Sequence, residues 1–441
     1  MSLCLNVLLL STSSIVAQQI SLEFEPTELT HLRGEEIQNI TARLNSSSPL
    51  NVTIEFSCEN AENCDILNGS RTIEFHPDLP LEREINVSVR GLFLGHTKLT
   101  AKVPDNPEVD LHYESFEITV LRTASGAQMT LIFTGFVVIF IVVNTFMMGT
   151  QLHIQAIKEC LKKPVGPVIG FCCQYILMPL VAFGWANVFL RNFPSLQFGY
   201  FAVGCSPGGG MSNFWTILLE GNLDLSVTMT FFSNAAAIGM LPFWLYTLGR
   251  LFFAGRIEIP FLNVIQSLGT LLIPAVFGIL FTHFRPQYRS KIEKILKIFT
   301  LIFMIIMIPF SIYANLYVFK LFRWYTVVCG FLLPWTGYSV SYLIAFLLKQ
   351  SHRDCRTIAV ETGIQNGGIA VLLCQLSLPE PDGDLTLVMP VCVFCFTGLP
   401  LWLFFFALKC YNKRAEKGQL QKEPIELAEQ RSSMLNGGDE K

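Results

Sequence analysis

The sequence predicts a chain of two parts: an N-terminal extracellular β-sandwich and an all-α polytopic membrane domain with nine transmembrane helices. Three observations indicate this. The chain has 441 residues, of which 51% are hydrophobic, which is too apolar for one soluble domain. Its first quarter is polar and alternates short apolar and polar runs, as half-buried strands do. The remainder contains apolar runs that are long enough to cross a bilayer as helices.

Residues 1–17 are predicted to be a signal peptide. The stretch is apolar and ends in small residues, with cleavage expected after Ala17. It lacks a positively charged start, so an uncleaved N-terminal anchor is the alternative, although the run is short for a membrane span.

Residues 18–125 are predicted to form a β-sandwich, immunoglobulin-like in the loose sense. Several segments alternate apolar and polar residues with a period of two, and Pro, Gly, Asn and Asp separate them. Five or more short strands in a segment of this length are typical of a sandwich. The clearest candidates are residues 50–56, 71–75, 84–89, 97–103 and 113–120.

The same segment carries five Asn-X-Ser/Thr sequences, which are acceptors for N-linked glycans. Because they cluster here and are absent from the C-terminal tail, they predict that the sandwich is luminal or extracellular. Cys58 and Cys64 are then expected to close a small loop by a disulfide bond. The ten cysteines that follow lie in or near apolar runs and are interpreted as packing residues. The predicted glycosylation sites are Asn39, Asn45, Asn51, Asn68 and Asn86.

Nine apolar runs after Gly126 make up the predicted membrane domain, residues 126–411. Loops placed on one side of the membrane carry fifteen Lys and Arg residues, against five on the other, so the C-terminus is expected in the cytosol. An odd number of spans then places the sandwich outside. The charged tail, residues 412–441, has few aromatic residues and is expected to be disordered. The runs are residues 129–152, 165–188, 196–219, 223–249, 261–282, 298–318, 325–348, 358–376 and 386–411.

Two of these runs contain residues that interrupt a helix. In the third run, Pro207 is followed by three glycines, which cannot continue a helix. In the eighth run, a carboxylate, two amides and three glycines lie between Glu361 and Gly368. An ionised side chain at such depth costs ~2.5–3.5 kcal/mol. A cluster of interhelical hydrogen bonds is the simpler interpretation of isolated polar residues, but this combination favours a broken helix that holds a cation.

Paired interruptions in the two halves of a membrane domain predict an inverted-repeat secondary transporter with two crossing broken helices. Neighbouring runs add polar groups, namely Gln174 in the second run and Ser226, Thr230 and Ser233 on one face of the fourth. Hydroxyls on an apolar helix commonly bond to their own backbone. Together with Glu361, however, they offer the all-oxygen environment of a hard cation. One carboxylate balances one positive charge, so sodium is the expected coupling ion.

Three segments resemble signature sequences of the bile acid:sodium symporter family (solute carrier family 10). They are Gln174-Tyr-Ile-Leu-Met-Pro-Leu-Val-Ala-Phe183, Gly204-Cys-Ser-Pro-Gly-Gly-Gly-Met-Ser-Asn213 and Glu361-Thr-Gly-Ile-Gln-Asn366. The resemblance covers roughly residues 129–411. The long ectodomain resembles the orphan branch of the family.

The resemblance implies two sodium sites and one substrate contact. The first sodium site would use Ser212, Asn213, Ser226, Thr230 and Glu361. The second would use Gln174, Glu361 and Gln365, and Asn366 matches a position that contacts substrate.

These features predict sodium-coupled uptake of an organic anion, bile-acid-like or steroid-conjugate-like, by alternating access. The expected partners are this anion, sodium ions and the lipid bilayer, with the plasma membrane as the expected location. The net charge of −3 excludes a broad nucleic-acid-binding surface. The alternative is a receptor or adhesion protein in which the sandwich binds a partner and the membrane domain does not transport. An enzyme is not supported, because Glu361 lacks a nearby histidine or metal-ligand partner in the sequence.

Overall fold

The computed structural model describes residues 19–46, 51–76, 80, 82–104, 110–151, 162, 164–252 and 261–436. The predicted signal peptide, residues 1–17, lies outside these ranges. The chain divides into two compact units, Met1–Leu131 and Ile132–Lys441. The division falls within helix α2 (Ala124–Gln151), close to the predicted boundary at residue 125.

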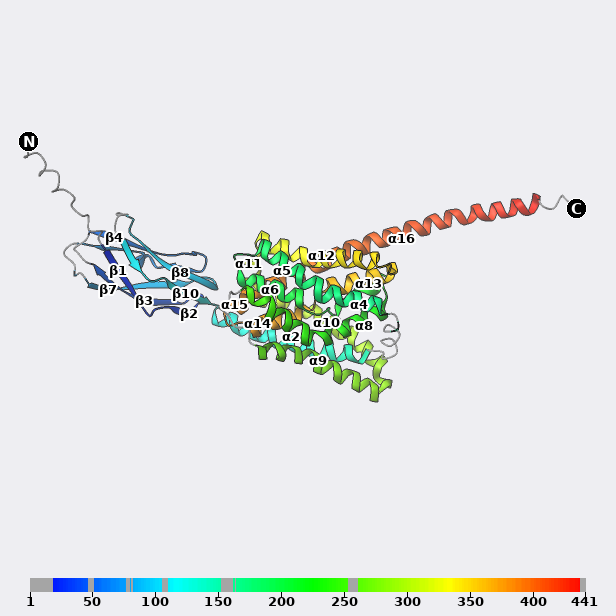
Figure 1. Ribbon diagram of the computed structural model, residues 1–441, viewed down its shortest axis with the longest axis horizontal. Coiled ribbons are helices and arrows are strands. Elements are labelled where there is room, and N and C mark those ends of the chain that lie inside the picture. The colour runs from blue at the N-terminus through cyan, green and yellow to red at the C-terminus, as the bar shows by residue number, and fades with distance from the viewer. Residues whose placement is uncertain are drawn as a thin grey trace, which may run out of the picture. The chain divides into compact units, whose positions relative to one another are not determined.

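In the first unit, the described residues form ten strands in two five-stranded sheets (Figure 1). Sheet A has the order β5-β7-β3-β1-β9, and sheet B has the order β2-β10-β8-β4-β6. This confirms the predicted β-rich N-terminal domain. The strands are β1 (Gln19–Glu25), β2 (Leu29–Arg33), β3 (Ile37–Ser46), β4 (Val52–Cys58), β5 (Cys64–Ile66), β6 (Thr72–Phe75), β7 (Glu82–Gly91), β8 (Gly95–Lys102), β9 (Asp110–Tyr113) and β10 (Phe116–Leu121), with a short helix α1 (Asn68–Arg71).

Alternation along the strands produces one core between the sheets, because every second side chain of a strand points to the same face. On β3 of sheet A, Ile40 and Leu44 are buried, and on β4 of sheet B, Ile54 and Phe56 are buried in the same cluster. The residues that alternate with the buried ones, such as Arg43 and Glu55, are polar and exposed. The period-two pattern in the sequence therefore corresponds to an inward and an outward face.

The five predicted glycosylation asparagines are all exposed. Two of them are neighbours on the outer face of sheet A, where β3 pairs with β7 in antiparallel register. Ser88 Oγ donates to Asn39 Oδ1 at 2.8 Å, and Thr41 Oγ1 donates to Asn86 Oδ1 at 3.4 Å. Each asparagine thus accepts a hydrogen bond from the hydroxyl of the other acceptor triplet. Asn45 lies further along the same outward face of β3.

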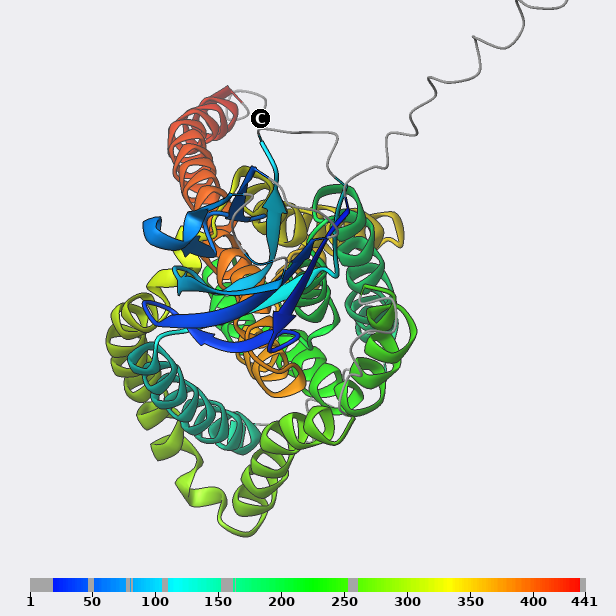
Figure 2. The same ribbon diagram turned by 90° about the vertical axis from the view of Figure 1, so that its left-hand side faces the viewer.

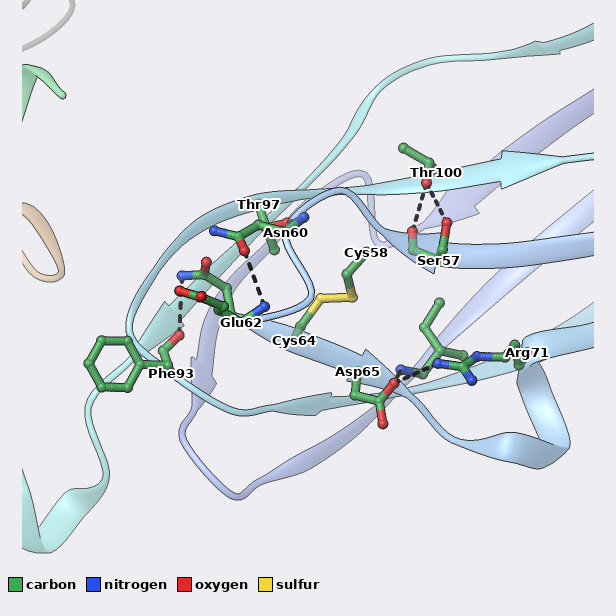
Figure 3. The surroundings of a disulfide bond; sticks show 12 residues. Ser57, Cys58, Asn60, Glu62, Cys64, Asp65, Arg71, Phe93, Thr97 and Thr100 are labelled. Atoms are coloured by element: carbon green, nitrogen blue, oxygen red, sulfur yellow. Dashed lines mark hydrogen bonds and ion pairs between the residues drawn. A yellow bond between two sulfur atoms is a disulfide. The ribbon is translucent and has the colours of Figure 1, made fainter. Parts of the chain in front are cut away.

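A disulfide joins Cys58, at the end of β4, to Cys64, at the start of β5, with the Cα atoms 6.0 Å apart (Figure 3). The short loop between them is held by further hydrogen bonds. Asn60 donates its backbone N–H to Thr97 Oγ1 at 3.0 Å, and its side-chain oxygen accepts the N–H of Glu62 at 3.1 Å. The disulfide therefore connects the two sheets at one end of the sandwich.

The second unit is mostly α-helical, and its helices lie side by side in a bundle, seen from the side in Figure 1 and along their axes in Figure 2. Its elements are α4 (Val165–Cys172), the π-helix η1 (Cys173–Leu177), α5 (Met178–Phe189), α6 (Pro194–Cys205), α7 (Met211–Leu218), α8 (Leu223–Thr247), η2 (Gly249–Leu251), α9 (Phe261–Phe284), η3 (Pro286–Tyr288), α10 (Arg289–Ala314), α11 (Leu316–Lys320), α12 (Trp324–Leu347), α13 (His352–Gly363), α14 (Gly367–Ser377), α15 (Asp382–Thr386) and α16 (Val388–Asn436), and α2 enters it from the first unit.

Five helical stretches among the described residues are long and apolar enough to cross a membrane. They are Ala124–Met147, Val165–Phe189, Leu223–Leu251, Trp324–Leu347 and Asp382–Arg414. Length and composition alone therefore support five of the nine predicted spans. The third and eighth predicted runs are each divided into two shorter helices, α6 with α7 and α13 with α14, at the predicted interruptions. The fifth and sixth runs overlap α9 and α10.

The distribution of polarity in this unit is the reverse of that in a soluble domain. Large apolar side chains such as Phe243, Leu347 and Leu403 are more than half exposed, whereas Ser226 and Glu361 are buried. Apolar surface on this scale is typical of contact with lipid, and buried polar groups within such a bundle are typical of a functional site.

The tail differs from the prediction of disorder, because α16 continues as one helix to Asn436 (Figure 1). Residues 412–436 are rich in Glu, Lys, Gln, Ala and Leu. These residues have high helix propensity, and the same polar composition is also typical of disordered segments. Composition alone therefore does not distinguish a helical tail from a disordered one.

Candidate functional site

Two helix interruptions lie at the centre of the candidate site. The first break, residues 206–210, separates α6 from α7, and the second break, residues 364–366, separates α13 from α14. Pro207 has no N–H to donate, and it disfavours helical geometry at Ser206, whose φ and ψ of −65° and 152° are extended. Ile364 is extended as well, at −94° and 99°.

The two breaks pair with each other across an antiparallel bridge between Gly208 and Gln365. Gly209 donates its backbone N–H to Ile364 O at 2.8 Å, and Asn366 donates its N–H to Pro207 O at 2.8 Å. Each break therefore supplies hydrogen-bond partners for the backbone of the other, as irregular backbone at membrane depth requires.

Glycine is required in the first break because the second lies so close. A Cβ atom on Gly208 would lie 2.6 Å from Glu361 Oε1, and one on Gly209 would lie 2.7 Å from Gln365 O. A larger residue at Gly208 would displace the carboxylate of Glu361 or the bridge, and one at Gly209 would push the two breaks apart.

The first predicted donor set, Ser212, Asn213, Ser226, Thr230 and Glu361, comes together from α7, α8 and α13. Ser226 Oγ lies 3.0 Å from Glu361 Oε2 and 2.9 Å from Asn213 Oδ1. Thr230 Oγ1 lies 2.5 Å from Glu361 Oε1 and 2.9 Å from Ser226 O. Ser212 Oγ is buried and has no partner at hydrogen-bonding geometry.

The two hydroxyls of this first set each have more than one acceptor. Each hydroxyl of Ser226 and Thr230 carries one proton but has two acceptors within reach. Neither hydroxyl can therefore donate to both of its acceptors at once. A bound cation would supply the missing positive charge.

The second predicted set, Gln174 and Gln365 with Glu361, is only partly assembled by direct contact. Gln174 Nε2 donates to Gln365 Oε1 and to Ser206 O, both at 2.7 Å. Gln174 Oε1 is buried without a partner among the described residues. The same holds for the Oγ1 of Thr362, the residue that follows Glu361. Glu361 has no hydrogen bond to either glutamine within the described part of the chain. Instead Gly208 lies against both Glu361 and Gln365.

The charge of Glu361 is not balanced by a basic side chain. Its exposed fraction is 2%, and no Lys, Arg or His of the described ranges forms an ion pair with it. An isolated buried carboxylate is costly unless it is paired or coordinates a cation. Among the described residues, side-chain oxygens of Gln174, Ser212 and Thr362 are buried without hydrogen-bond partners and would add neutral ligands. An all-oxygen set with one carboxylate fits a hard monovalent cation.

Asn366 is the N-cap of α14, and its Oδ1 accepts the N–H of Ile369 at 3.3 Å. The N-terminus of α7 begins at the other break, directly after Gly210. Helix N-termini carry partial positive charge, so both breaks end in a helix terminus that favours an anion. The substrate contact predicted for Asn366 stays a prediction beside this capping role.

Several contributors were not identified from the sequence. The Ser206 carbonyl accepts from Gln174, the buried hydroxyl of Thr216 lies 3.2 Å from Ser226 Oγ, and Thr362 faces inward. Thr216 is one helical turn beyond Ser212 on α7, a spacing that could have indicated it. Thr362 lies inside the interrupted stretch itself. Carbonyl ligands leave no signal in the sequence.

Comparisons with known proteins agree with this geometry. A model of the Sodium Bile acid symporter family matches residues 138–320, which include the first break. The ileal sodium/bile acid cotransporter of Mus musculus is 31% identical over 295 residues, covering 65% of this chain and 84% of that protein.

Two further relatives are an organic anion transporter and a hepatic cotransporter. The sodium-dependent organic anion transporter of Bos taurus is 34% identical over 260 residues, 57% of this chain and 66% of that protein. The hepatic sodium/bile acid cotransporter of Rattus norvegicus is 28% identical over 271 residues, 60% of this chain and 74% of that protein.

Proposed function

The chain belongs to the sodium bile acid symporter family, a family of transporters rather than enzymes, and from this premise we propose that it couples the inward movement of sodium to uptake of an organic anion. The relatives are sodium/bile acid cotransporters and sodium-dependent organic anion transporters. By extension, the proposed substrate is an anionic amphiphile of the bile-acid or steroid-conjugate class. The resemblance to the orphan branch is part of the same proposal.

One observation carries the proposal: Glu361 is buried beside two paired breaks, with hydroxyls of Ser226 and Thr230 at its carboxylate and no basic partner among the described residues. A protein that only bound a partner at its ectodomain would have no physical need for such a costly group at membrane depth.

The proposed coupling follows from the charge of Glu361. Without sodium, an anion approaching the α7 and α14 N-termini meets an unbalanced carboxylate next to the break. With sodium bound among Ser212, Ser226 and Glu361, that charge is balanced and the helix termini attract the anion. The substrate then binds more tightly to the sodium-loaded protein, and the reverse must hold equally. Transport by alternating access would move both together.

The proposed topology has nine spans. It adds α9, α10 and the two broken helix pairs to the five stretches that meet the criteria of length and composition. The excess of Lys and Arg on one side supports a cytosolic C-terminus and a sandwich on the outside. The exposed asparagines of all five acceptor triplets fit this orientation, with the plasma membrane as the proposed location.

Replacing the carboxylate by an amide tests the proposal. Glu361→Gln keeps the shape of the side chain but removes the charge, so sodium affinity should fall by roughly 100-fold, the equivalent of ~3 kcal/mol. Sodium-dependent uptake of a panel of bile acids and sulfated steroids is measured against choline, with surface protein quantified in parallel. Glu380→Gln, at an exposed glutamate, is the matched control. Undiminished sodium stimulation in Glu361→Gln would exclude this site.

A receptor or adhesion role is the second candidate, because the outer face of sheet B carries none of the predicted glycan sites on its strands. That face is polar, with Lys98 and Glu117 3.8 Å apart across β8 and β10. Deleting residues 18–125 behind the signal peptide separates the two functions. A transporter should retain sodium-dependent uptake in the truncated form, whereas loss of partner binding with no transport in either form would favour the receptor.

A further inference from the structure

Tyr175 is the neighbour in sequence of Gln174 from the second donor set, and it contacts α8, which carries Ser226 and Thr230 of the first set. It follows Gln174 directly, within the π-helix η1, and its side chain is fully buried. A single π-turn within a helix commonly marks a functional site. Here the turn has a cause that can be identified in the sequence.

Pro179 causes the irregular turn. In a regular α-helix the N–H of residue 179 would bond to the carbonyl of Tyr175, but proline has no N–H and its ring clashes with that carbonyl. The π-turn relieves the clash and leaves Tyr175 O without its usual donor. Trp244 of α8 supplies a replacement, with its Nε1–H donating to Tyr175 O at 2.7 Å.

The other end of the same residue is also bound to α8. The Tyr175 hydroxyl donates to the carbonyl of Ser233. Ser233 Oγ in turn accepts the N–H of Gly208 at 3.3 Å and donates to Thr230 O at 3.0 Å. Tyr175 is therefore held at both its backbone and its hydroxyl by the helix that presents Ser226 and Thr230.

We propose that Tyr175 and Trp244 are positioning residues that hold the two sodium sites in register, so that occupation of one site favours occupation of the other. The inference rests on the proposed function. Gln174 of the second set is fixed to η1, and Thr230 of the first set is fixed to α8. A displacement of η1 along α8 would disturb both sets at once. The ion that binds first orders this connection for the second, and such coupling is reciprocal.

The test measures sodium binding without any substrate. The thermal stability of the purified full-length protein is titrated with NaCl, with choline chloride keeping the ionic strength constant, because an ion that binds only the folded state raises its stability. The sodium midpoint is the sodium concentration that gives half of the stabilisation reached by the wild type at the highest NaCl concentration used. In Tyr175→Phe this midpoint should rise roughly fivefold, because weaker binding stabilises less at every sodium concentration. The stabilisation should also rise less steeply with sodium concentration, as expected for two ions that bind independently.

Two variants make the measurement decisive. Trp244→Phe keeps an aromatic ring but removes the N–H that donates to Tyr175 O, and it should shift the sodium midpoint in the same direction. This variant tests the proposal even if Tyr175→Phe yields no folded protein. Tyr200→Phe is the matched control, because Tyr200 is likewise fully buried and donates its hydroxyl to a backbone carbonyl, that of Cys329 on α12, at 3.0 Å. It should lower the stability in choline and leave the sodium midpoint unchanged.

The outcomes separate this inference from the function on which it rests. A wild-type protein that sodium stabilises, with the same midpoint and steepness in Tyr175→Phe and Trp244→Phe, would overturn the positioning role alone. A wild-type protein that sodium does not stabilise at all, relative to choline, would overturn the proposed function and the inference with it.

Discussion

The two breaks meet at one point, but they contribute different chemical groups. The first break, residues 206–210, contributes backbone, since its glycines have no side chains and Pro207 and Ser206 offer carbonyls. The second contributes side chains, with Glu361 just before it and Gln365 within it. Two breaks with long side chains could not approach so closely, and two glycine-rich breaks would carry no charge. The first break therefore allows the close approach, and the second carries the side chains of the proposed ion site.

The glycines differ in the same way. In the first break, Gly208 and Gly209 face oxygens of Glu361 and Gln365. Those that flank the second break face aromatic rings instead, Tyr338 for Gly363 and Phe394 for Gly367. Substitutions in the first break should therefore disturb ion binding, and substitutions around the second should mainly disturb packing.

Gly208→Ala should give the largest effect. The new Cβ would lie 2.6 Å from Glu361 Oε1, so either the carboxylate or the bridge must move. Overpacking of this kind costs about 1–3 kcal/mol, which corresponds at its upper end to a roughly 100-fold loss of sodium affinity. Sodium-dependent uptake per surface molecule measures it. Gly239→Ala, at an exposed position of α8 with open space around it, is the control and should transport normally.

Loss of the hydrogen bond between Gln174 and Gln365 should reduce sodium affinity less than Gly208→Ala does. Either substitution to alanine leaves a buried amide without its partner, which costs about 1–3 kcal/mol and should raise the half-saturating sodium concentration by roughly tenfold. The double variant should cost less than the sum, because no amide is then left unpaired. Strictly additive effects would show that the two side chains act separately.

Asn366 tests whether the second break also contributes to substrate binding. Losing its cap on α14 should cost ~1 kcal/mol, so Asn366→Ala should reduce transport by roughly fivefold. Asn366→Asp keeps a capping oxygen and should restore it. A variant with aspartate that binds sodium normally but has lost affinity for the anionic substrate would assign Asn366 to the substrate, as the sequence predicted.

Gly367→Ala should give the smallest effect, although its Cβ would lie only 1.4 Å from the Phe394 ring. Phe394 is 45% exposed, so its ring can turn away. The sodium midpoint should stay within about twofold of the wild type, since repacking of this kind costs little at an exposed ring. A shift as large as that of Gly208→Ala would remove the proposed distinction between the breaks.

The sequence predicted the parts of the site that have a local signal. Pro207 with three glycines marks one break, and a carboxylate inside an apolar run marks the other. The strands of the sandwich were predictable for a similar reason, because alternation is local. Nothing in the sequence indicates that Gly208 pairs with Gln365 or that β1 pairs with β9, since such pairing depends on contacts between distant segments.

The irregular turn at Tyr175 lies between these cases. Pro179 predicts that the carbonyl of Tyr175 loses its usual helical donor. The replacement donor, Trp244, depends on the packing of α8 and cannot be predicted locally. The C-terminal tail shows the limit of composition, because strongly charged residues with high helix propensity suit both a disordered tail and the helix found in α16.

The pairing of the breaks also has a consequence for the order in which the protein is made. Pro207 O and Gly209 N find their partners on residues that are synthesised more than a hundred residues later. Until Ile364 and Asn366 enter the membrane, the first break carries backbone groups with no bond to make, each costing several kcal/mol in lipid. The part of the membrane domain that is synthesised first must therefore be protected from lipid until the second break is inserted. Chains truncated before residue 364 should accordingly be degraded soon after synthesis rather than accumulate as half-built transporters.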